Sequence, residues 1–386
     1  MRRRSLLVAG VVAALVVTAL PAFAGASRHD SSAVPDATVK WTIGTDFTVG
    51  GTRFDGVFVQ QTGLVYFLGF RTFADATDGS IWTYDPATRV FADTGVDMPV
   101  PISNYGIAAL QDSRGLGLYV FGGRSSTGEI LTTVQVYYPE LNRAQVISSD
   151  PWPGTTPSGC VSLPAMGVAV VQNQAIVMGG ASFSTSVPPC VDDNSSETWI
   201  FNPASAPGAK WTAGPPLTVA RGYVTATVLQ GRVYAIGGDQ NSAGTLNAVS
   251  TVEAWKPFGG GWNDAAVADL PLGCDESAAF PATSGALRGI TLAGCGQWPN
   301  ALPDTYLYDP TGNAWSLVGS LREPVRNQAG VQLPGGTMLV VGGYDCPGNA
   351  CLGDPTVLSE NGKGQATGFA GVGSAHHTGA GRAATN

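Results

Sequence analysis

The chain has 386 residues, a formal net charge of −8 at pH 7 and only 12% charged residues. An acidic chain of this kind lacks the basic face that nucleic acid or an anionic membrane surface needs, so we exclude both as partners. Its 52 glycines and 26 prolines are typical of many short strands joined by tight turns, and not of helices.

The first residues resemble a secretory signal. Arg2, Arg3 and Arg4 precede an apolar stretch at 6–20, and Ala22-Phe23-Ala24 offers a small-X-small cleavage site. We therefore expect a signal peptide over 1–24, a flexible linker over 25–36 and a secreted, extracellular product. A membrane anchor is the alternative, disfavoured because the apolar stretch is short. The choice between the Sec and twin-arginine export routes stays open.

The body of the chain repeats one motif, an apolar strand that ends in paired glycine. The glycines recur every 48 to 58 residues, which is the period of a repeated four-stranded unit. One unit, at 217–262, shows four strands joined as an antiparallel meander. The copies lie at 65–69, 118–123, 175–180, 233–238, 289–294 and 338–343.

An aromatic-X-Pro turn follows each strand pair, and a second aromatic residue comes soon after it. Proline presets the turn, and Asp or Asn before it bonds the backbone two residues on. We predict that the paired aromatic residues stack between blades; a sugar-stacking role is the less favoured alternative. The pairs are Tyr84 with Phe91, Phe201 with Trp211, Trp255 with Trp262 and Tyr308 with Trp315, whereas Ala144 replaces the second aromatic residue after Tyr137.

These motifs make the chain resemble a kelch-repeat β-propeller, similar to the central domain of galactose oxidase. The resemblance implies an all-β fold over 37–360, a six-bladed propeller of four-stranded antiparallel blades. Second strands would end near Gly69, Gly123, Gly180, Gly238, Gly294 and Gly343.

The last blade lacks an outer strand after Val357-Leu358-Ser359. The segment Lys40-Trp41-Thr42-Ile43-Gly44 closely copies the outer strand at 210–214, so we expect the N-terminal strand to close the last blade. Closure leaves only short, protected sheet edges. The Gly- and Ala-rich residues 361–386 cannot bury enough apolar surface to order, so we expect a disordered tail.

An even number of cysteines in a secreted chain predicts disulfides. Sequence alone allows fifteen pairings, and the register of the blades favours three that would each staple one blade on the same face. Metal binding is the alternative, disfavoured because no histidine accompanies the cysteines. The favoured pairs are Cys160–Cys190, Cys274–Cys295 and Cys346–Cys351.

No catalytic constellation is evident. His29, His376 and His377 all lie outside the repeats, so neither a Ser-His-Asp or Cys-His arrangement nor a histidine metal centre is expected. The copper chemistry of galactose oxidase is not carried over, because its ligands include histidine. We expect no cofactor and no metal.

Candidate ligand contacts come from the repeat register. Arg53, Arg221 and Arg326 each precede the first repeat glycine by sixteen residues, which predicts equivalent places at the start of inner strands. Their guanidinium groups suit a carboxylate or a pair of sugar hydroxyls; bonds to backbone or to an adjacent acid are the favoured alternative. The predicted channel rim consists of Arg53, Asn104, Tyr105, Arg221, Asp275, Glu276 and Arg326.

A second polar cluster follows Cys190. Asp192, Asp193, Asn194 and Glu197 suit calcium in residue type, but their spacing is not that of a known loop. A solvated loop is the favoured interpretation.

The favoured function is a secreted, monomeric binding module for an extracellular protein or glycan. Its loops at 122–133, 181–197 and 239–248 would form the recognition surface on a rigid scaffold. The alternative is a sugar epimerase or mutarotase, which rests on resemblance to six-bladed kelch sialic acid epimerases of the bacterial envelope. Channel-rim arginines would bind its substrate, and Glu276 would serve as acid–base group. A hydrolase or oxidase domain that has lost its site is a third hypothesis.

Overall fold

A computed structural model describes residues 37–72 and 74–346 and the backbone of 358–361. The predicted signal peptide and linker lie outside these residues, as does the predicted C-terminal tail apart from its first residue, Asn361, which ends a strand. The described residues belong to one compact unit, 34–386. They are almost entirely β-structure, with one short 3-10 helix, η1 (Pro139–Leu141). No helix among them is long and apolar enough to cross a membrane.

Five sheets are built from strands that follow one another along the chain, each running antiparallel from an inner to an outer strand. The first two consist of β3 (Gly56–Val59), β4 (Leu64–Arg71), β5 (Thr77–Asp85) and β6 (Val90–Asp97), and of β7 (Gly106–Asp112), β8 (Gly115–Phe121), β9 (Val134–Tyr138) and β10 (Arg143–Val146). The third consists of β11 (Val168–Val171), β12 (Gln174–Met178), β15 (Thr198–Phe201) and β16 (Trp211–Ala213). The fourth consists of β17 (Thr225–Leu229), β18 (Arg232–Ile236), β21 (Val252–Lys256) and β22 (Gly259–Asn263). The fifth consists of β23 (Ala278–Ala282), β24 (Gly289–Gln297), β25 (Asn300–Asp309) and β26 (Ala314–Ser320).

A further sheet joins both ends of the described chain. It consists of β27 (Ala329–Gln332), β28 (Met338–Val341), β29 (Leu358–Asn361) and β2 (Thr42–Ile43). The prediction of a β-propeller with four-stranded antiparallel blades is confirmed. The six-blade count and the closure stay predictions, because residues 347–357, which join β28 to β29, lie outside the described residues.

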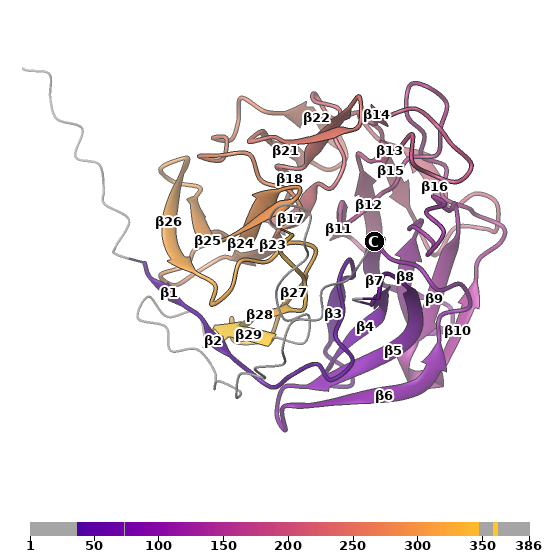
Figure 1. Cartoon of the computed structure of the whole chain (residues 1–386), viewed down its shortest axis with the longest axis horizontal. Helices are drawn as coiled ribbons and strands as arrows, with labels where there is room; N and C mark the ends of the chain where they lie inside the picture. The colour runs from indigo at the N-terminus through magenta and orange to yellow at the C-terminus, as the bar shows by residue number, and fades with distance from the viewer. Residues whose placement is uncertain (1–36, 73, 347–357, 362–386) are drawn as a thin grey trace, which may run out of the picture. The chain divides into compact units, whose positions relative to one another are not determined.

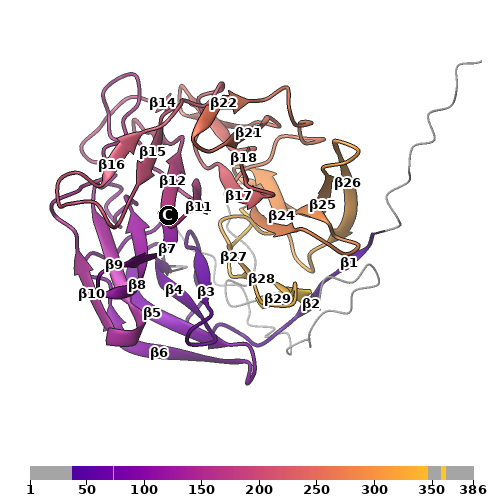
Figure 2. The same ribbon diagram turned by 180° about the vertical axis from the view of Figure 1, so that it is seen from behind.

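The inner strands follow one another around a central axis, as Figures 1 and 2 show from opposite sides. Strand β7 contacts β3 and β11, and β17 lies between β11 and β23. Strand β27 contacts both β23 and β3. The hydrophobic clusters lie between neighbouring sheets, so each sheet buries its faces against its neighbours.

The N-terminal segment is anchored to three sheets: the fifth blade, the sheet that contains β29, and the first blade. Strand β1 (Val39–Lys40) pairs in parallel with the outer strand β26, and β2 pairs antiparallel with β29. Trp41 is 2% exposed, and its indole N–H donates to Thr305 Oγ1 at 2.9 Å in the fifth blade. Phe47 is buried against the aromatic rings of the first blade, with Phe91 at 5.0 Å between centroids. Val357, which belongs to the strand that the predicted closure would pair with the Trp41 segment, lies outside the described residues.

The predicted aromatic pairs are present. Each pair spans the third and fourth strands of one blade, with ring centroids 4.7 to 5.7 Å apart. Both rings of a pair belong to the same sheet, and the expected packing between blades is present for two of the pairs. Phe201 and Trp211 pack against Phe121 of the preceding blade, with centroids 5.1 and 5.4 Å apart, and Tyr308 packs against Tyr234 at 6.1 Å. Trp262 joins the blades by a hydrogen bond, which its indole N–H donates to Thr198 Oγ1 at 3.1 Å.

The paired glycines are required by close approach of the next blade. At Gly237, φ is +55°, and a Cβ atom would lie 2.0 Å from the carbonyl oxygen of Cys274. At Gly179, φ is +69°, and a Cβ would lie 2.4 Å from the carbonyl of Arg221. The following amides, Gly238 and Gly180, donate to these same carbonyls at 2.8 and 2.9 Å. Each glycine pair thus binds the start of the next inner strand.

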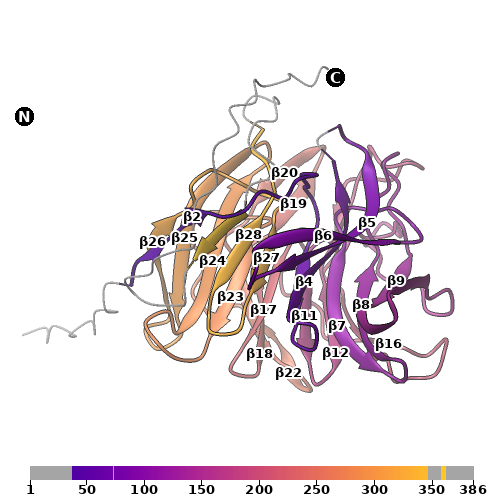
Figure 3. The ribbon, with the colours of Figure 1, turned by 90° about the horizontal axis from the view of Figure 1, so that it is seen from below.

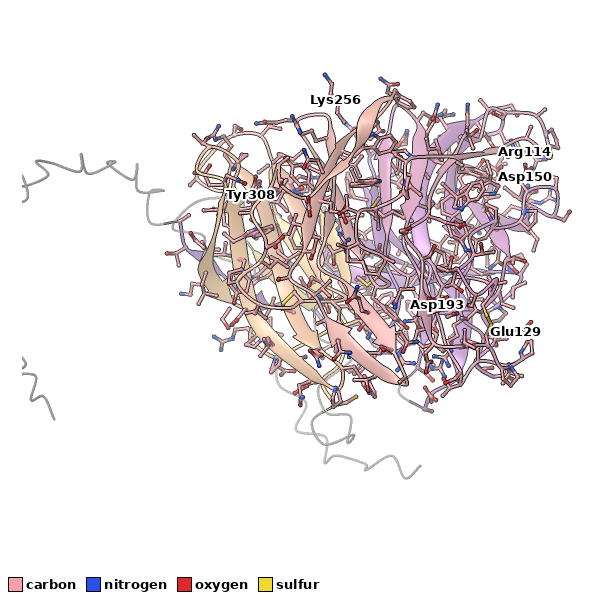
Figure 4. The ribbon with its side chains drawn as sticks, turned by 90° about the horizontal axis from the view of Figure 1, so that it is seen from above. Arg114, Glu129, Asp150, Asp193, Lys256 and Tyr308 are labelled. Carbon is pink, nitrogen blue, oxygen red and sulfur yellow. A yellow bond between two sulfur atoms is a disulfide. The ribbon has the colours of Figure 1, made fainter. Side chains whose placement is uncertain are left out.

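Two extra hairpins extend from the third and fourth blades after their paired glycines, β13 (Ala181–Ser182) with β14 (Asp193–Asn194), and β19 (Asp239–Ser242) with β20 (Thr245–Ala248). Figure 3 shows β19 and β20 at the end of the blades opposite to β22. Figure 4 shows Glu129 and Asp193 near one end and Arg114 and Lys256 near the other. We call the end that bears the loops after the glycines the glycine face.

Two of the predicted disulfides are present, Cys160–Cys190 and Cys274–Cys295. The first links the segment before β11 to the β13–β14 hairpin. The second links the segment before β23 to strand β24. Cys346 is also disulfide-bonded, while its predicted partner, Cys351, lies outside the described residues.

Candidate functional site

The inner strands begin just after residues with a left-handed backbone. Such a conformation costs a non-glycine residue about 1–3 kcal/mol. Backbone bonds between blades hold it: the amide of Arg53 donates to the Asn327 carbonyl, and the amide of Asn104 donates to the Arg53 carbonyl, both at 2.7 Å. We call the residues with φ between 49° and 60° at these positions the channel ring: Arg53, Asn104, Met166, Tyr223, Glu276 and Asn327.

The channel ring corrects the predicted register. The residue before a ring residue pairs with the residue two places after the first repeat glycine in blades such as the first and fourth, where Thr52 pairs with Arg71 and Gly222 with Asp239. The number of residues from the ring residue to this glycine varies between 13 and 18, because the hairpins differ in length. Counting back sixteen residues therefore reaches the ring at Arg53, but it passes the ring by one residue at Arg326 and by two residues at Arg221. The prediction that these arginines are equivalent is wrong.

Arg221 is a structural residue and does not line the channel. Its side chain is fully buried, and its Nη1 lies 2.5 Å from Glu253 Oε1, which is also fully buried. The guanidinium also donates to the carbonyls of Gly237 at 2.7 Å and Val219 at 2.8 Å. Since Glu253 lies in β21 and Gly237 follows β18 of the same sheet, Arg221 points into its own blade.

Arg326 joins two acids beneath the channel ring. Its Nη2 lies 2.8 Å from Asp275 Oδ2 and 2.6 Å from Glu276 Oε2. Asp275 is fully buried in this pair. Glu276 also accepts a hydrogen bond from Asn327 Nδ2, which donates to the Tyr344 hydroxyl at 2.9 Å as well. The acids predicted at this level are thus brought together with one of the predicted arginines.

Tyr105 is 1% exposed and faces away from the channel. Its hydroxyl donates to the carbonyl of Gly69 at 3.0 Å and so links the second blade to the first. The prediction that Tyr105 rims the channel is therefore wrong, because it follows the ring residue Asn104 by one position.

A cavity of 370 Å³ opens above the channel ring. Four of the seven predicted rim residues line it: Arg53, Asn104, Glu276 and Arg326. Three further lining residues, Tyr223, Trp298 and Tyr344, were not predicted. The others lie in the loops predicted as the recognition surface, although none was predicted as a channel-rim residue: Arg124, Phe183, Ser184, Thr185, Asp192, Asn241 and Leu246.

The repeat itself carries a signal for lining residues that were not predicted at the channel rim. Arg124 and Tyr344 lie two positions after the first repeat glycine, and Phe183, Asn241 and Trp298 lie four positions after it. Alternate residues of an extended segment share one side, so the second strand continues past the glycines with these side chains over the channel.

Two cavity arginines have no acidic partner. Arg53 donates from Nε and Nη2 to the Tyr344 hydroxyl at 3.3 and 3.1 Å. Arg124 donates from Nε to the Gly128 carbonyl at 3.3 Å and lies over the Phe183 ring at 5.5 Å. Among residues 37–72 and 74–346, neither forms an ion pair with a carboxylate, whereas Arg71, Arg221 and Arg326 each do. Burial lowers the pKa of Arg124, and the positive charges of Arg53 and Arg71 lower it further.

The two extra hairpins form one wall of the cavity. Asn194 Nδ2 donates to the Asn241 carbonyl at 2.9 Å, and the Asn241 amide donates back to Asn194 Oδ1 at 2.8 Å. Asp192 accepts from the Ser184 amide at 2.8 Å and from Asn241 Nδ2 at 3.2 Å. The wall is therefore a hydrogen-bonded unit.

The acidic side chains after Cys190 accept hydrogen bonds within this wall and beside it. Asp193 accepts from the Ser158 amide at 2.9 Å, and Glu197 accepts from the Thr155 amide at 2.8 Å. Within the described part of the chain, no group of three or more His, Cys, Asp or Glu side chains is arranged to hold a metal ion.

Burial controls the titration of the acids around the channel. It raises the pKa of Glu276 to about 7, against the opposing charge of Arg326, and it raises the pKa of Asp55 to about 7. Burial, followed by the charges of Asp275 and Glu276, raises the pKa of Asp239 well above its ordinary value. The cavity therefore combines two guanidinium groups that form no ion pair within the described chain with one carboxyl, that of Glu276, whose pKa lies near neutral pH.

No family profile matches the chain. It is 28% identical to beta-scruin of Limulus polyphemus over 180 residues, which are 46% of this chain and 18% of that protein. It is 29% identical to alpha-scruin of the same organism over 143 residues, 36% of this chain and 14% of that protein. The chain thus spans less than a fifth of the length of both relatives.

Among solved structures, the chain is similar to the one titled "Structure of YjhT". The TM-score is 0.59 and the sequence identity 16%, over 80% of this chain and 95% of that one. Scruins are kelch-repeat proteins and YjhT is a kelch-type propeller, so the predicted kelch-repeat β-propeller is confirmed. At this identity the likeness to YjhT shows the fold alone.

The buried pair of Arg221 and Glu253 predicts a large effect on stability. Arg221→Met leaves the Glu253 carboxylate buried without a cation, so we expect the free energy of unfolding to fall by about 3–5 kcal/mol. The double variant Arg221→Met/Glu253→Leu should regain most of this loss. Urea unfolding followed by circular dichroism measures both, and a single variant as stable as the wild type would contradict the structural role.

The raised pKa values predict that stability falls as pH rises. Asp55, Asp239, Asp275 and Glu276 bind protons more tightly in the folded than in the unfolded chain. From about pH 4.5 to above 7 the folded state therefore holds more protons, and the free energy of unfolding decreases with pH. Acids with lowered pKa values, such as Asp112, are ionised in both states over this range.

Thermal melts between pH 4.5 and 8.5 test this. The melting temperature should be highest near pH 5, and Asp239→Asn, whose amide cannot ionise, should flatten the decrease. A wild-type melting temperature that rises steadily to pH 8 would be inconsistent with buried, protonated carboxyls.

Proposed function

We propose that this kelch-repeat β-propeller is a secreted binding module that holds an acidic glycan by its carboxylate in the channel cavity. The observation that carries the proposal is the pair of arginines, Arg53 and Arg124, that line the cavity without an acidic partner in the described chain. A partly buried cation loses hydration, and hydrogen bonds to neutral groups compensate for this less fully than pairing with an anion does. A ligand carboxylate would supply that pairing through charge-assisted hydrogen bonds.

The remaining lining suits the hydroxyl groups of a sugar. Asn104, Asn241, Ser184 and Thr185 provide both donors and acceptors around the arginines. The volume of 370 Å³ lies within the range of small-molecule sites, which hold their ligands by a few placed polar groups. One sugar residue of a larger glycan matches this size, so the binding surface extends from the cavity over the loops of the glycine face.

Secretion is part of the proposal. The disulfides Cys160–Cys190 and Cys274–Cys295 are compatible with an oxidising compartment, as is the signal-like segment at 1–24. We further propose that the module acts as a monomer with the cavity open to solvent.

One observation favours a second candidate, a sugar epimerase or mutarotase. Glu276 lines the cavity, and burial raises its pKa to about 7, which suits a group that must both accept and donate a proton near neutral pH. Glu276→Gln distinguishes the candidates: it abolishes interconversion of sugar anomers or epimers if Glu276 is catalytic.

We also propose that the ring has six blades and that β2 closes the last one. Support comes from the pairing of Thr42 with Glu360 and of Ile43 with Ser359, and from β27, which contacts β23 and β3. The buried rings of Trp41 and Phe47 hold the segment on both sides of β2.

Closure predicts that the N-terminal segment stabilises the whole propeller. Trp41→Ala should lower the free energy of unfolding by about 3–5 kcal/mol, the usual cost of removing a buried aromatic side chain. Deleting residues 37–44 removes β1 and β2 as well and should lower the melting temperature further. Val49→Ala, at an exposed position nearby, is the control, and an unchanged melting curve for the deletion would refute the closure.

Carboxylate binding predicts a clear mutational pattern. N-acetylneuraminate or D-glucuronate should bind by isothermal titration calorimetry, and Arg53→Gln or Arg124→Gln should each weaken binding about tenfold or more, since a charge-assisted hydrogen bond contributes about 1.5–3 kcal/mol. Arg114→Gln, at the opposite end of the blades (Figure 4), is the matched control and should bind as the wild type. Equal affinity for D-glucose and D-glucuronate would contradict the proposal.

A further inference from the structure

The cavity is lined by four aromatic side chains in the described part of the chain, and they differ in exposure. Phe183, Tyr223 and Tyr344 are 7%, 6% and 4% exposed. Trp298 lines the same cavity but is half-buried. A guanidinium lies near the ring in both cases, Arg124 at Phe183 and Arg326 at Trp298, so the exposed fraction distinguishes them. Trp298 is therefore the cavity aromatic with ring surface left for a ligand.

The position of Trp298 is fixed by its surroundings. It lies in the two-residue turn between β24 and β25, where Gln297 pairs with Asn300. The Cys346 amide donates to the Pro299 carbonyl at 3.0 Å, and the Ala301 amide donates to Asp345 Oδ1 at 2.7 Å, so the turn is bound to the segment after β28. Three residues before Trp298, Cys295 is bonded to Cys274.

The ring itself is oriented by two contacts. The Arg326 guanidinium lies 5.5 Å from its centroid. The Tyr344 ring packs edge-on, with centroids 6.2 Å apart and planes at 76°. A platform held in this way needs little ordering when a ligand binds, which favours affinity.

The indole N–H of Trp298 also differs from those of the other tryptophans. Seven of the nine tryptophans donate theirs to a protein acceptor, and that of Trp255 is buried. Trp298 donates to no acceptor among residues 37–72 and 74–346. A sugar hydroxyl above the turn would provide one.

We infer that Trp298 is the stacking platform for a sugar ring, so that the site selects cyclic acidic sugars over open-chain carboxylates of the same charge. The inference rests on the proposed carboxylate binding and adds selectivity for the sugar ring, which the arginines do not provide. Arg53 and Arg124 recognise the carboxylate of any sugar acid. The flat, apolar indole face matches the axial C–H groups of a pyranose, whereas a flexible chain loses more conformational freedom on the same surface.

The test uses D-glucuronate, which forms a pyranose, and D-gluconate, an open-chain acid with the same number of carbons and the same charge. Calorimetry on the full chain should give glucuronate an affinity about tenfold higher. In Trp298→Ala the two ligands should bind within about twofold of each other, and Trp298→Phe should restore most of the difference. Trp199→Phe, half-buried outside the cavity, should leave it unchanged.

The outcomes separate this inference from the proposed function. If the two ligands bind the wild type equally, or Trp298→Ala keeps the tenfold difference, while Arg53→Gln still weakens both, the stacking role is wrong and carboxylate binding stands. If glucuronate, gluconate and N-acetylneuraminate all fail to bind, both are wrong.

Discussion

The backbone of the channel ring is the constraint on which the site depends. Arg53, Asn104, Met166, Tyr223, Glu276 and Asn327 all adopt a left-handed conformation at the start of an inner strand. Backbone hydrogen bonds, such as those from Asn104 to Arg53 and from Arg53 to Asn327, join the start of one blade to the start of the next. The same geometry turns the side chains of Arg53, Asn104, Tyr223 and Glu276 into one cavity.

Glycine adopts this conformation at less cost, and it is found where the next blade approaches closely, at Gly179 and Gly237. Five of the six ring positions instead carry polar or charged side chains, and the sixth carries Met166. Strain of this kind persists where the surrounding structure fixes it, and it is often found at functional sites. The contrast between the two sets of positions therefore supports a binding role for the cavity.

Local patterns predicted the parts of the fold that depend on local chemistry. The paired glycines, the aromatic pairs such as Tyr308 with Trp315, and the disulfides Cys160–Cys190 and Cys274–Cys295 all follow from short motifs in a fixed register. The candidate site was predicted in part. Arg53, Asn104, Glu276 and Arg326 line the cavity, but Arg221 was misplaced because hairpin lengths vary between blades and a fixed count crosses that variation.

Other features depend on contacts between segments far apart in the chain. The sequence around Arg221 does not indicate that Glu253 pairs with it. The sequence around Trp298 does not indicate that Arg326 and Tyr344 orient its ring. Arg124 lies within the predicted recognition loop at 122–133, and the alternation of side chains beyond the paired glycines places it over the channel.

A crystal structure of the protein soaked with an acidic sugar tests the central claim most directly. The account predicts that the carboxylate lies within hydrogen-bond distance of both Arg53 and Arg124, above the channel ring. A sugar bound with its carboxylate directed to solvent, or seated elsewhere on the blades while the cavity holds only water, would contradict it.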